Sequence, residues 1–75
     1  MEKVMSKFAQ RLKELRKEKG LKQIEMAVFL GRTESHYQKI EYGEVNVPAL
    51  TLEKLADFFD VSTDYLLGRD DRRKP

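Results

Sequence analysis

The residues of this sequence best suited to chemistry are the polar side chains of one short segment, residues 33–39. If a helix here packs inward through Tyr37 and Ile40, its outward face carries hydroxyl, carboxylate, amide and ammonium groups: Thr33, Glu34, Ser35, Gln38 and Lys39. Such a face fits the major groove of DNA, about 12 Å wide, where polar side chains meet base edges. Lys39 would donate to guanine, and Glu34 would accept from the amino group of cytosine. The simpler alternative is an ordinary solvated helix face.

The sequence lacks the residues that most other chemistries need. It contains no Cys and a single His, His36, which excludes a disulfide framework, a Cys-rich zinc site and a Cys–His nucleophile pair. It also has no nucleophile–base pair, no set of metal ligands and no glycine loop that would cradle a phosphate. We therefore expect a protein that is not an enzyme and that uses no cofactor and no metal.

Length and charge narrow the choice further. The 75 residues allow one domain. No apolar run approaches the roughly 20 residues of a membrane helix, and residues 1–7 lack the apolar core of a signal peptide, so we expect a cytoplasmic protein with no membrane contact. The net charge is only +2, but residues 1–43 carry ten Lys and Arg against six Asp and Glu, whereas residues 44–75 carry five against seven. The basic half contains the polar segment, as a nucleic-acid partner would require.

Three helices are predicted in the basic half. Ser6 can cap a first helix whose apolar residues Phe8, Leu12 and Leu15 share one stripe, and Gly20 ends it. A second helix spans residues 23–30, and Thr33 can cap a third over residues 34–42. The turn between these two helices is only residues 31–33, which forces a steep crossing.

The packing of this crossing follows from residue size. Ala27 is small where the two helices cross, and Gly31 can adopt the positive φ that a sharp turn demands. Tyr37 and Ile40 of the third helix would pack against the second helix, at Met26, Ala27 and Leu30. The interpretation is a helix-turn-helix over residues 23–42 that leaves the polar face free.

The second half of the chain predicts two more helices and a tail. Thr51 can cap a fourth helix whose inward residues are Leu52, Leu55, Ala56 and Phe59, and Ser62 can cap a short fifth helix that Gly68 closes. Residues 69–75 are charged and have no apolar anchor, so we expect a disordered tail after a DNA-binding domain at 1–68. With no strand signal, the expected class is all-α.

From Phe8 to Gly68 the sequence resembles the Cro/phage-repressor helix-turn-helix family, also called the Xre family. The resemblance rests on RLKELRKEKGLKQ at 11–23, KIEYG at 39–43 and LEKLADFFDVSTDYLLG at 52–68, with Gln23, Ala27, Gly31 and Ile40 correctly spaced. It implies a compact five-helix lambda-repressor-like DNA-binding domain with its helix-turn-helix at helices two and three. It also implies a homodimer on a pseudo-palindromic operator in double-stranded DNA, with Tyr65, Leu66 or Leu67 near the two-fold axis.

The resemblance also assigns roles to individual residues. It implies that Gln23 clamps a phosphate and that Lys22, Tyr42 and Asn46 touch the sugar-phosphate backbone. The residues facing the bases would be Thr33, Glu34, Ser35 and Lys39. Glu41 lies in the last turn of its helix, where the dipole disfavours a carboxylate, and family members supply its cationic partner from the position of Arg16.

Several residues depart from the family pattern and leave alternatives open. Arg32 replaces an apolar residue and would turn outward to a phosphate, and Lys22 replaces the usual Ser or Thr cap. His36 would either touch a phosphate or be solvated. Ile24, Val28 and Phe29 replace charged residues, and they either enlarge the core or, where exposed, favour a protein partner through Ile24 and Val28.

Three functions are compatible with these features. The one we favour is a transcriptional regulator, a repressor that occupies a promoter as a dimer. An antitoxin would use the same DNA-binding surface and hold a toxin through the second helix or the tail. A helix-turn-helix used only for protein contact is the third, and absence of salt-dependent DNA binding would favour it.

Overall fold

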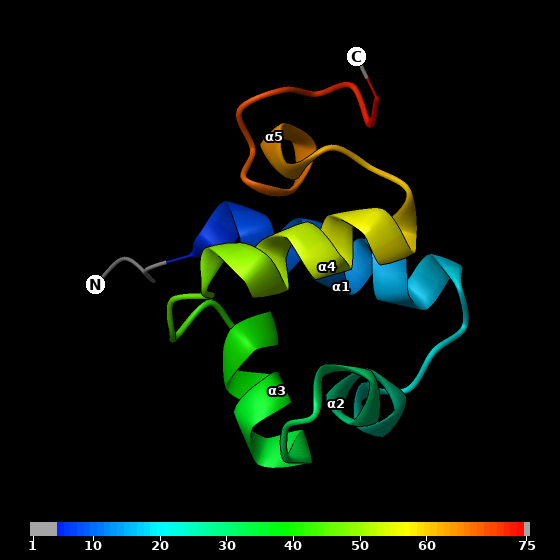
Figure 1. Ribbon diagram of the computed structural model, residues 1–75, viewed down its shortest axis with the longest axis vertical. Helices are drawn as coiled ribbons and strands as arrows, with labels where there is room; N and C mark the ends of the chain where they lie inside the picture. Colours follow the sequence, from blue (N-terminus) through cyan, green and yellow to red (C-terminus); the bar gives the residue numbers. More distant parts are fainter. Residues whose placement is uncertain (1–4, 75) are drawn as a thin grey trace.

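The computed structural model describes residues 5–74, and every regular element in that range is a helix. The helices are α1 (Ser6–Glu18), α2 (Gln23–Leu30), α3 (Glu34–Glu41), α4 (Ala49–Phe59) and α5 (Thr63–Leu66). Figure 1 shows the α2–α3 pair at one end of the molecule, α5 at the opposite end, and α1 and α4 between them. The expected all-α class with five helices is confirmed. Residues 1–4 and Pro75, which belong to the expected domain and tail, lie outside the described residues.

One apolar core joins all five helices. The predicted stripe of α1, Phe8, Leu12 and Leu15, is buried in it. The other buried members are Met26, Ala27, Tyr37, Ile40, Leu55, Ala56, Phe59, Val61, Tyr65 and Leu66. Leu52 is only half-buried, at the edge of this core. Because α1 packs against α3 and Phe58 of α4 contacts Phe29 of α2, these two helices support the α2–α3 pair from behind.

The turn between α2 and α3 has the predicted geometry. Gly31 ends α2 with a left-handed φ of 68°, and the N–H of Arg32 donates to the carbonyl of Ala27 at 2.9 Å. Thr33 then caps α3, since its hydroxyl accepts from the N–H of His36 at 3.1 Å. Ala27 is fully buried at the crossing. The sharp turn therefore rests on two residue types the sequence supplies, a glycine with positive φ and a hydroxyl cap.

Two predicted helix starts are wrong. Ser6 is the first residue of α1 rather than its cap; the cap is Met5, whose N–H donates to the carbonyl of Gly43 and whose carbonyl accepts from Ala9. Thr51 lies inside the first turn of α4, which begins at Ala49, because the carbonyl of Pro48 already accepts the N–H of Leu52 at 3.0 Å. In both cases the backbone contacts of the preceding loop decide where the helix starts.

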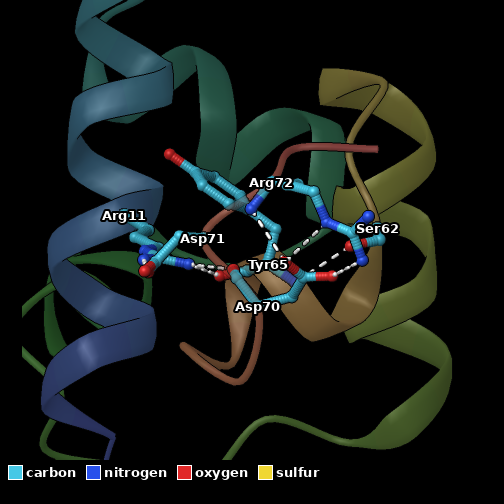
Figure 2. A network of polar contacts seen from close by, with 6 residues as sticks. All are labelled: Arg11, Ser62, Tyr65, Asp70, Asp71 and Arg72. Atoms are coloured by element: carbon cyan, nitrogen blue, oxygen red, sulfur yellow. Dashed lines mark hydrogen bonds and ion pairs between the residues drawn. The ribbon is translucent and has the colours of Figure 1, made fainter. Parts of the chain in front are cut away.

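The structure also differs from the expectation of a disordered tail. Residues 69–74, hereafter the C-terminal strap, fold back across α1 and α5 (Figure 2). The Arg11 guanidinium, on α1, donates to the carbonyls of Tyr65 and Asp70 and to the carboxylate of Asp71. The carbonyl of Arg73 accepts from the N–H of Ser62 at 2.7 Å. The strap lacks apolar residues, and it is held instead by ion pairs and hydrogen bonds that composition alone does not reveal.

Candidate nucleic-acid interface

The N-terminal face of α3 is polar and open to solvent. Its exposed residues are Arg32, Thr33, Glu34, Ser35, His36 and Lys39. Behind them Tyr37 and Ile40 are buried, with 0% and 3% exposure, and they fix the helix against the core. The structure therefore brings together all four residues expected to face bases. Gln38, expected on the same free face, is instead half-buried.

A buried ion pair ties α1 to the end of α3. The Arg16 Nε and Nη2 atoms donate to the two carboxylate oxygens of Glu41 at 2.8 and 2.9 Å, a bidentate arrangement. The exposed fraction of the side chain is 11% for Arg16 and 1% for Glu41. Arg16 also donates to the carbonyl of Leu21 at 2.7 Å, where the chain turns toward α2. The predicted pair is confirmed by this geometry.

The environment of this pair shifts three pKa values. Burial alone would raise the pKa of the Glu41 carboxyl, but hydrogen bonds from Arg16 and the positive charge beside it hold that pKa below its ordinary value. The hydrogen bond with Glu41 raises the pKa of Arg16 against the opposing effect of burial. Burial raises the pKa of the Tyr37 hydroxyl, and the neighbouring Glu41 carboxylate adds to the shift. Glu41 is therefore ionised and Tyr37 neutral at physiological pH.

Two glutamines extend this network toward the surface. Gln23, the first residue of α2, donates from Nε2 to Glu41 Oε1 at 3.3 Å, and Gln38 donates from Nε2 to Gln23 Oε1 at 3.3 Å. The expected phosphate clamp thus lies against α3, not free in solvent. Nothing in the sequence signals a contact between two amides 15 positions apart, so the link to Gln38 could not be predicted.

The start of α2 is capped, although Lys22 is not a residue type that usually caps a helix. Lys22 cannot accept a backbone hydrogen bond through its side chain, but its own backbone N–H donates to the carboxylate of Glu25 at 2.8 Å. Glu25 at the third helical position is the acidic half of a capping box, and this signal was available in the sequence. The Lys22 side chain stays exposed beside Gln23, where a phosphate would approach the helix N-terminus.

Cations without a carboxylate partner surround this end of the molecule. Within residues 5–74, Lys13, Lys17, Lys22, Arg32 and Lys39 form no ion pair, although the chain carries many carboxylates. In the strap, at the opposite end, most cations are paired: Arg72 with Asp70, Arg73 with Glu18 and Lys74 with Asp60, while Arg69 forms no ion pair within residues 5–74. The positive charge near α2 and α3 therefore remains available for an anionic partner.

The remaining expected backbone contacts flank the same face. Tyr42 caps the C-terminal end of α3 with 46% of its surface exposed, and Asn46 is exposed in the loop before α4. Arg32 and His36 are exposed at the turn and in the first turn of α3. No cluster of three or more His, Asp or Glu side chains able to hold a metal ion occurs in the described part of the chain. Nor is any helix within residues 5–74 long and apolar enough to cross a membrane.

The unusual apolar residues of α2 divide into two groups. Phe29 stacks on Phe58 of α4 with 4.5 Å between ring centroids, so it enlarges the core. Ile24 and Val28 do not, since they are 45% and 73% exposed and, with Glu25, line a shallow surface groove. For these two residues the interpretation as extra core is wrong.

Two of the three residues expected near a two-fold axis are buried within the chain. Tyr65 and Leu66 are 7% and 0% exposed, and only Leu67 keeps partial exposure. The guanidinium of Arg11 lies 4.2 Å from the centre of the Tyr65 ring, and that of Arg73 lies 5.6 Å from it. The strap therefore covers part of the surface where the resemblance placed a dimer contact.

Comparison with known proteins agrees with this geometry. The helix-turn-helix family model matches residues 12–66. A prophage-derived, uncharacterized HTH-type transcriptional regulator of Bacillus subtilis, YonR, is 47% identical over 60 residues, covering 80% of this chain and 56% of the relative. A second B. subtilis HTH-type regulator, YqaE, is 39% identical over 67 residues, covering 89% and 58%. The chain thus spans just over half the length of these curated relatives.

A solved structure has the same fold. The restriction-modification controller protein C.AhdI of Aeromonas hydrophila superposes with a TM-score of 0.71 at 39% sequence identity. The match covers 83% of this chain and 94% of that one. The matched part, which has the same five-helix fold, therefore makes up nearly all of that chain.

Proposed function

Because this chain belongs to the Cro/C1-type, or Xre, helix-turn-helix family, we propose that it binds double-stranded DNA sequence-specifically and regulates transcription, acting as a repressor. The observation that carries the proposal is the α3 face: polar side chains stand exposed on a helix that Tyr37 and Ile40 anchor to the core. Its relatives are named as transcriptional regulators and a controller protein, which supports the same function. We place the protein in the cytoplasm, with the DNA that it would bind.

In this proposal the residues of the interface divide between two tasks. Thr33, Glu34, Ser35 and Lys39 read base edges from the groove. The others position the helix on the backbone: Lys22, Gln23, Arg32, His36, Tyr42 and Asn46. The protein binds as a homodimer to a pseudo-palindromic operator, which requires each α3 to enter one half-site.

Selection of binding sites from random duplexes tests the proposal. We expect a palindromic consensus and binding that weakens as salt rises, because phosphate contacts release counterions. Failure to enrich any sequence, together with binding that salt does not affect, would contradict it. Contact with another protein alone would then be the better interpretation.

Binding of variants to the same duplexes distinguishes the residues that face bases from those that contact phosphates. Lys39→Ala should cost about 1–3 kcal/mol on the preferred site and relax base preference at one position in each half-site. Lys22→Ala should weaken all sequences alike and lower the salt slope by about one unit for each phosphate that Lys22 neutralises. Gln23→Ala should weaken all sequences alike with little change in slope, because its phosphate contact is neutral. If Lys39→Ala leaves the ratio of specific to non-specific affinity unchanged, the assignment of readers is wrong.

A second candidate function, contact with a protein partner, is favoured by the exposed Ile24 and Val28. This contact would also serve an antitoxin. Val28→Ser tests it, since a residue that is 73% exposed can be replaced with little effect on folding. Loss of regulation in a reporter with unchanged DNA affinity would support a partner on α2, whereas unchanged regulation would mean that DNA occupancy suffices.

A further inference from the structure

Gln38 lies on α3, but none of the proposed DNA contacts explains the position of its side chain. The sequence predicted an exposed side chain here, but the Gln38 side chain is half-buried. Its amide donates to Gln23 Oε1 at 3.3 Å, and Gln23 in turn donates to Glu41 Oε1. The two bonds form a chain from the buried ion pair through α2 to α3.

The chemistry of Glu41 determines which way the Gln23 amide faces. An ionised carboxylate can only accept hydrogen bonds, so the amide nitrogen of Gln23 must be the atom turned toward Glu41. The Gln23 oxygen is then left to face Gln38, which meets it with a donor. A glutamine offers both a donor and an acceptor, but here only one orientation satisfies both neighbours.

The chain of bonds leaves one N–H of the Gln23 amide without a partner among the described residues. The Nε2 atom carries two hydrogens, of which one is used by Glu41. From the geometry we propose that Gln38 is a positioning residue: it holds the Gln23 amide in the orientation that leaves its second N–H for a DNA phosphate. This inference rests on the proposed function, in which Gln23 clamps the backbone.

The benefit of this arrangement is preorganisation. A free glutamine side chain has several rotatable bonds and loses their freedom when it binds. Gln23 has lost much of that freedom before DNA arrives, so less is lost on binding. Because Gln38 lies on the reading helix, a shift of α3 in the groove also changes the clamp.

The test is a double-mutant cycle of Gln38→Met and Gln23→Met, since methionine keeps the length of glutamine without its hydrogen bonds. The matched control is Gln10→Met, because Gln10 is an exposed glutamine on α1 whose side chain makes no hydrogen bond within residues 5–74. Binding to a random-sequence duplex and to a selected duplex is measured at one fixed salt concentration. The amide resonances of Gln23 are followed by NMR without DNA.

We expect Gln38→Met to weaken both duplexes alike by about fivefold, the range of one net neutral hydrogen bond, and to have no further effect beside Gln23→Met. The control should bind as the unaltered protein does. In the DNA-free protein, Gln38→Met should shift the side-chain amide resonances of Gln23.

Three results would contradict this positioning role, and each points to a different explanation. A loss confined to the selected duplex would mean that Gln38 reads a base itself. A loss that persists beside Gln23→Met would mean that it acts by another route. If Gln38→Met leaves the Gln23 resonances unmoved, the positioning role is wrong, whether or not the protein binds DNA. If the unaltered protein does not bind DNA, the proposed function is refuted.

Discussion

Glu41 is the residue on which the proposed interface depends most. Its carboxylate accepts from Arg16 on α1 and from Gln23 on α2, while its own backbone belongs to α3. One side chain thus holds the three helices that present the reading face. A carboxylate in the last turn of a helix opposes the helix dipole, so its position makes sense only with the cation beside it.

Removing one partner of this pair should destabilise the fold more than it affects binding. We expect Arg16→Met to lower the free energy of unfolding by about 3–5 kcal/mol, because Glu41 would remain buried without its cation. Urea denaturation measures the change. Arg32→Met is the matched control, as an exposed arginine without an ion pair among the described residues, and should change stability by less than about 0.5 kcal/mol. Equal effects of the two variants would contradict the role of the pair.

The same pair should make stability depend on pH in the acid range. The pKa of Glu41 in the folded chain lies below its ordinary value of 4.5, so ionised Glu41 contributes stability above that pH. This contribution is lost as the pH falls toward the folded pKa. Melting curves between neutral and acid pH should therefore show a loss that Glu41→Gln reduces. A variant with the same slope would indicate that other carboxyls dominate.

Among single residues, the ion pair of Glu41 was predicted, whereas the contact between Gln23 and Gln38 was not. The helix dipole predicted that Glu41 needs a cationic partner, and the family resemblance named Arg16 as that partner. The Gln23–Gln38 contact joins two neutral side chains, whose placement depends on how α2 and α3 cross. Neither charge nor periodicity marks such a contact.

Among the elements, the turn between α2 and α3 is the one most tightly determined by residue type. A Cβ at Gly31 would meet no atom within 4 Å, so only its φ of +68° resists substitution. We expect Gly31→Ala to cost about 1–2 kcal/mol, the penalty of a left-handed conformation for an L-residue, measured by thermal or urea unfolding. Gly31→Asn should cost less, because asparagine tolerates this region better. A cost from alanine equal to that from asparagine would argue against a purely backbone effect.

The C-terminal strap is the element held most completely by charge. Arg11 makes three hydrogen bonds beneath it, and only 12% of the Arg11 side chain is exposed, whereas Asp71 is 95% exposed. Exposed ion pairs are individually weak and are screened by salt. The buried guanidinium is therefore the anchor that keeps the strap ordered.

Release of the strap can be measured by limited trypsin digestion after Arg69, Arg72 and Arg73. We expect Arg11→Met to accelerate cleavage there several-fold, and added salt to accelerate it in the unaltered chain, because closing depends on ionic contacts. A free peptide of residues 69–75 corrects for the effect of salt on the protease. Arg32→Met serves as the variant control. Cleavage as slow in Arg11→Met as in the unaltered chain would mean that Arg11 does not anchor the strap.

Helix boundaries and the strap show where reasoning from the sequence stopped short. Periodicity located α1 and α4, because their apolar stripes must face one core, and capping residues such as Thr33 and Ser62 marked the shorter helices. The starts at Ser6 and Ala49 depend on backbone contacts of Met5 and Pro48 that no side chain announces. For the strap, composition indicated disorder, but Glu18 and Asp60 supply countercharges from distant elements.

Across the whole molecule, charge is divided between two ends. The end formed by α2 and α3 carries cations without ion pairs among the described residues. At the α5 end, the strap cations Arg72, Arg73 and Lys74 are each paired with a carboxylate, two of them with carboxylates of α1 and of the end of α4. An anionic duplex would therefore meet the α2–α3 end first. This leaves the flanks and the α5 end for contact between two copies.

Leu67 is the residue through which we expect two copies of the chain to meet. Because Tyr65 and Leu66 are buried within each chain, substituting them should unfold the domain, whereas the partly exposed Leu67 is available at a two-fold axis. We expect Leu67→Glu to weaken dimerisation by at least about tenfold while unfolding at nearly the same urea concentration, as a charge in an apolar contact costs more than about 1.4 kcal/mol. Sedimentation velocity measures the first effect and urea denaturation the second.

The operator provides an independent check on the same geometry. A two-fold pair of domains requires half-site centres about one helical turn, roughly 34–36 Å, apart. Inserting about five base pairs between the half-sites turns them to opposite faces of the duplex, so two copies in contact cannot occupy both. We expect this insertion to reduce affinity for the unaltered protein strongly and for Leu67→Glu only slightly, because that variant binds each half-site separately. If both proteins lose affinity equally, the contact between copies lies away from Leu67; if neither does, the protein reads DNA as a monomer.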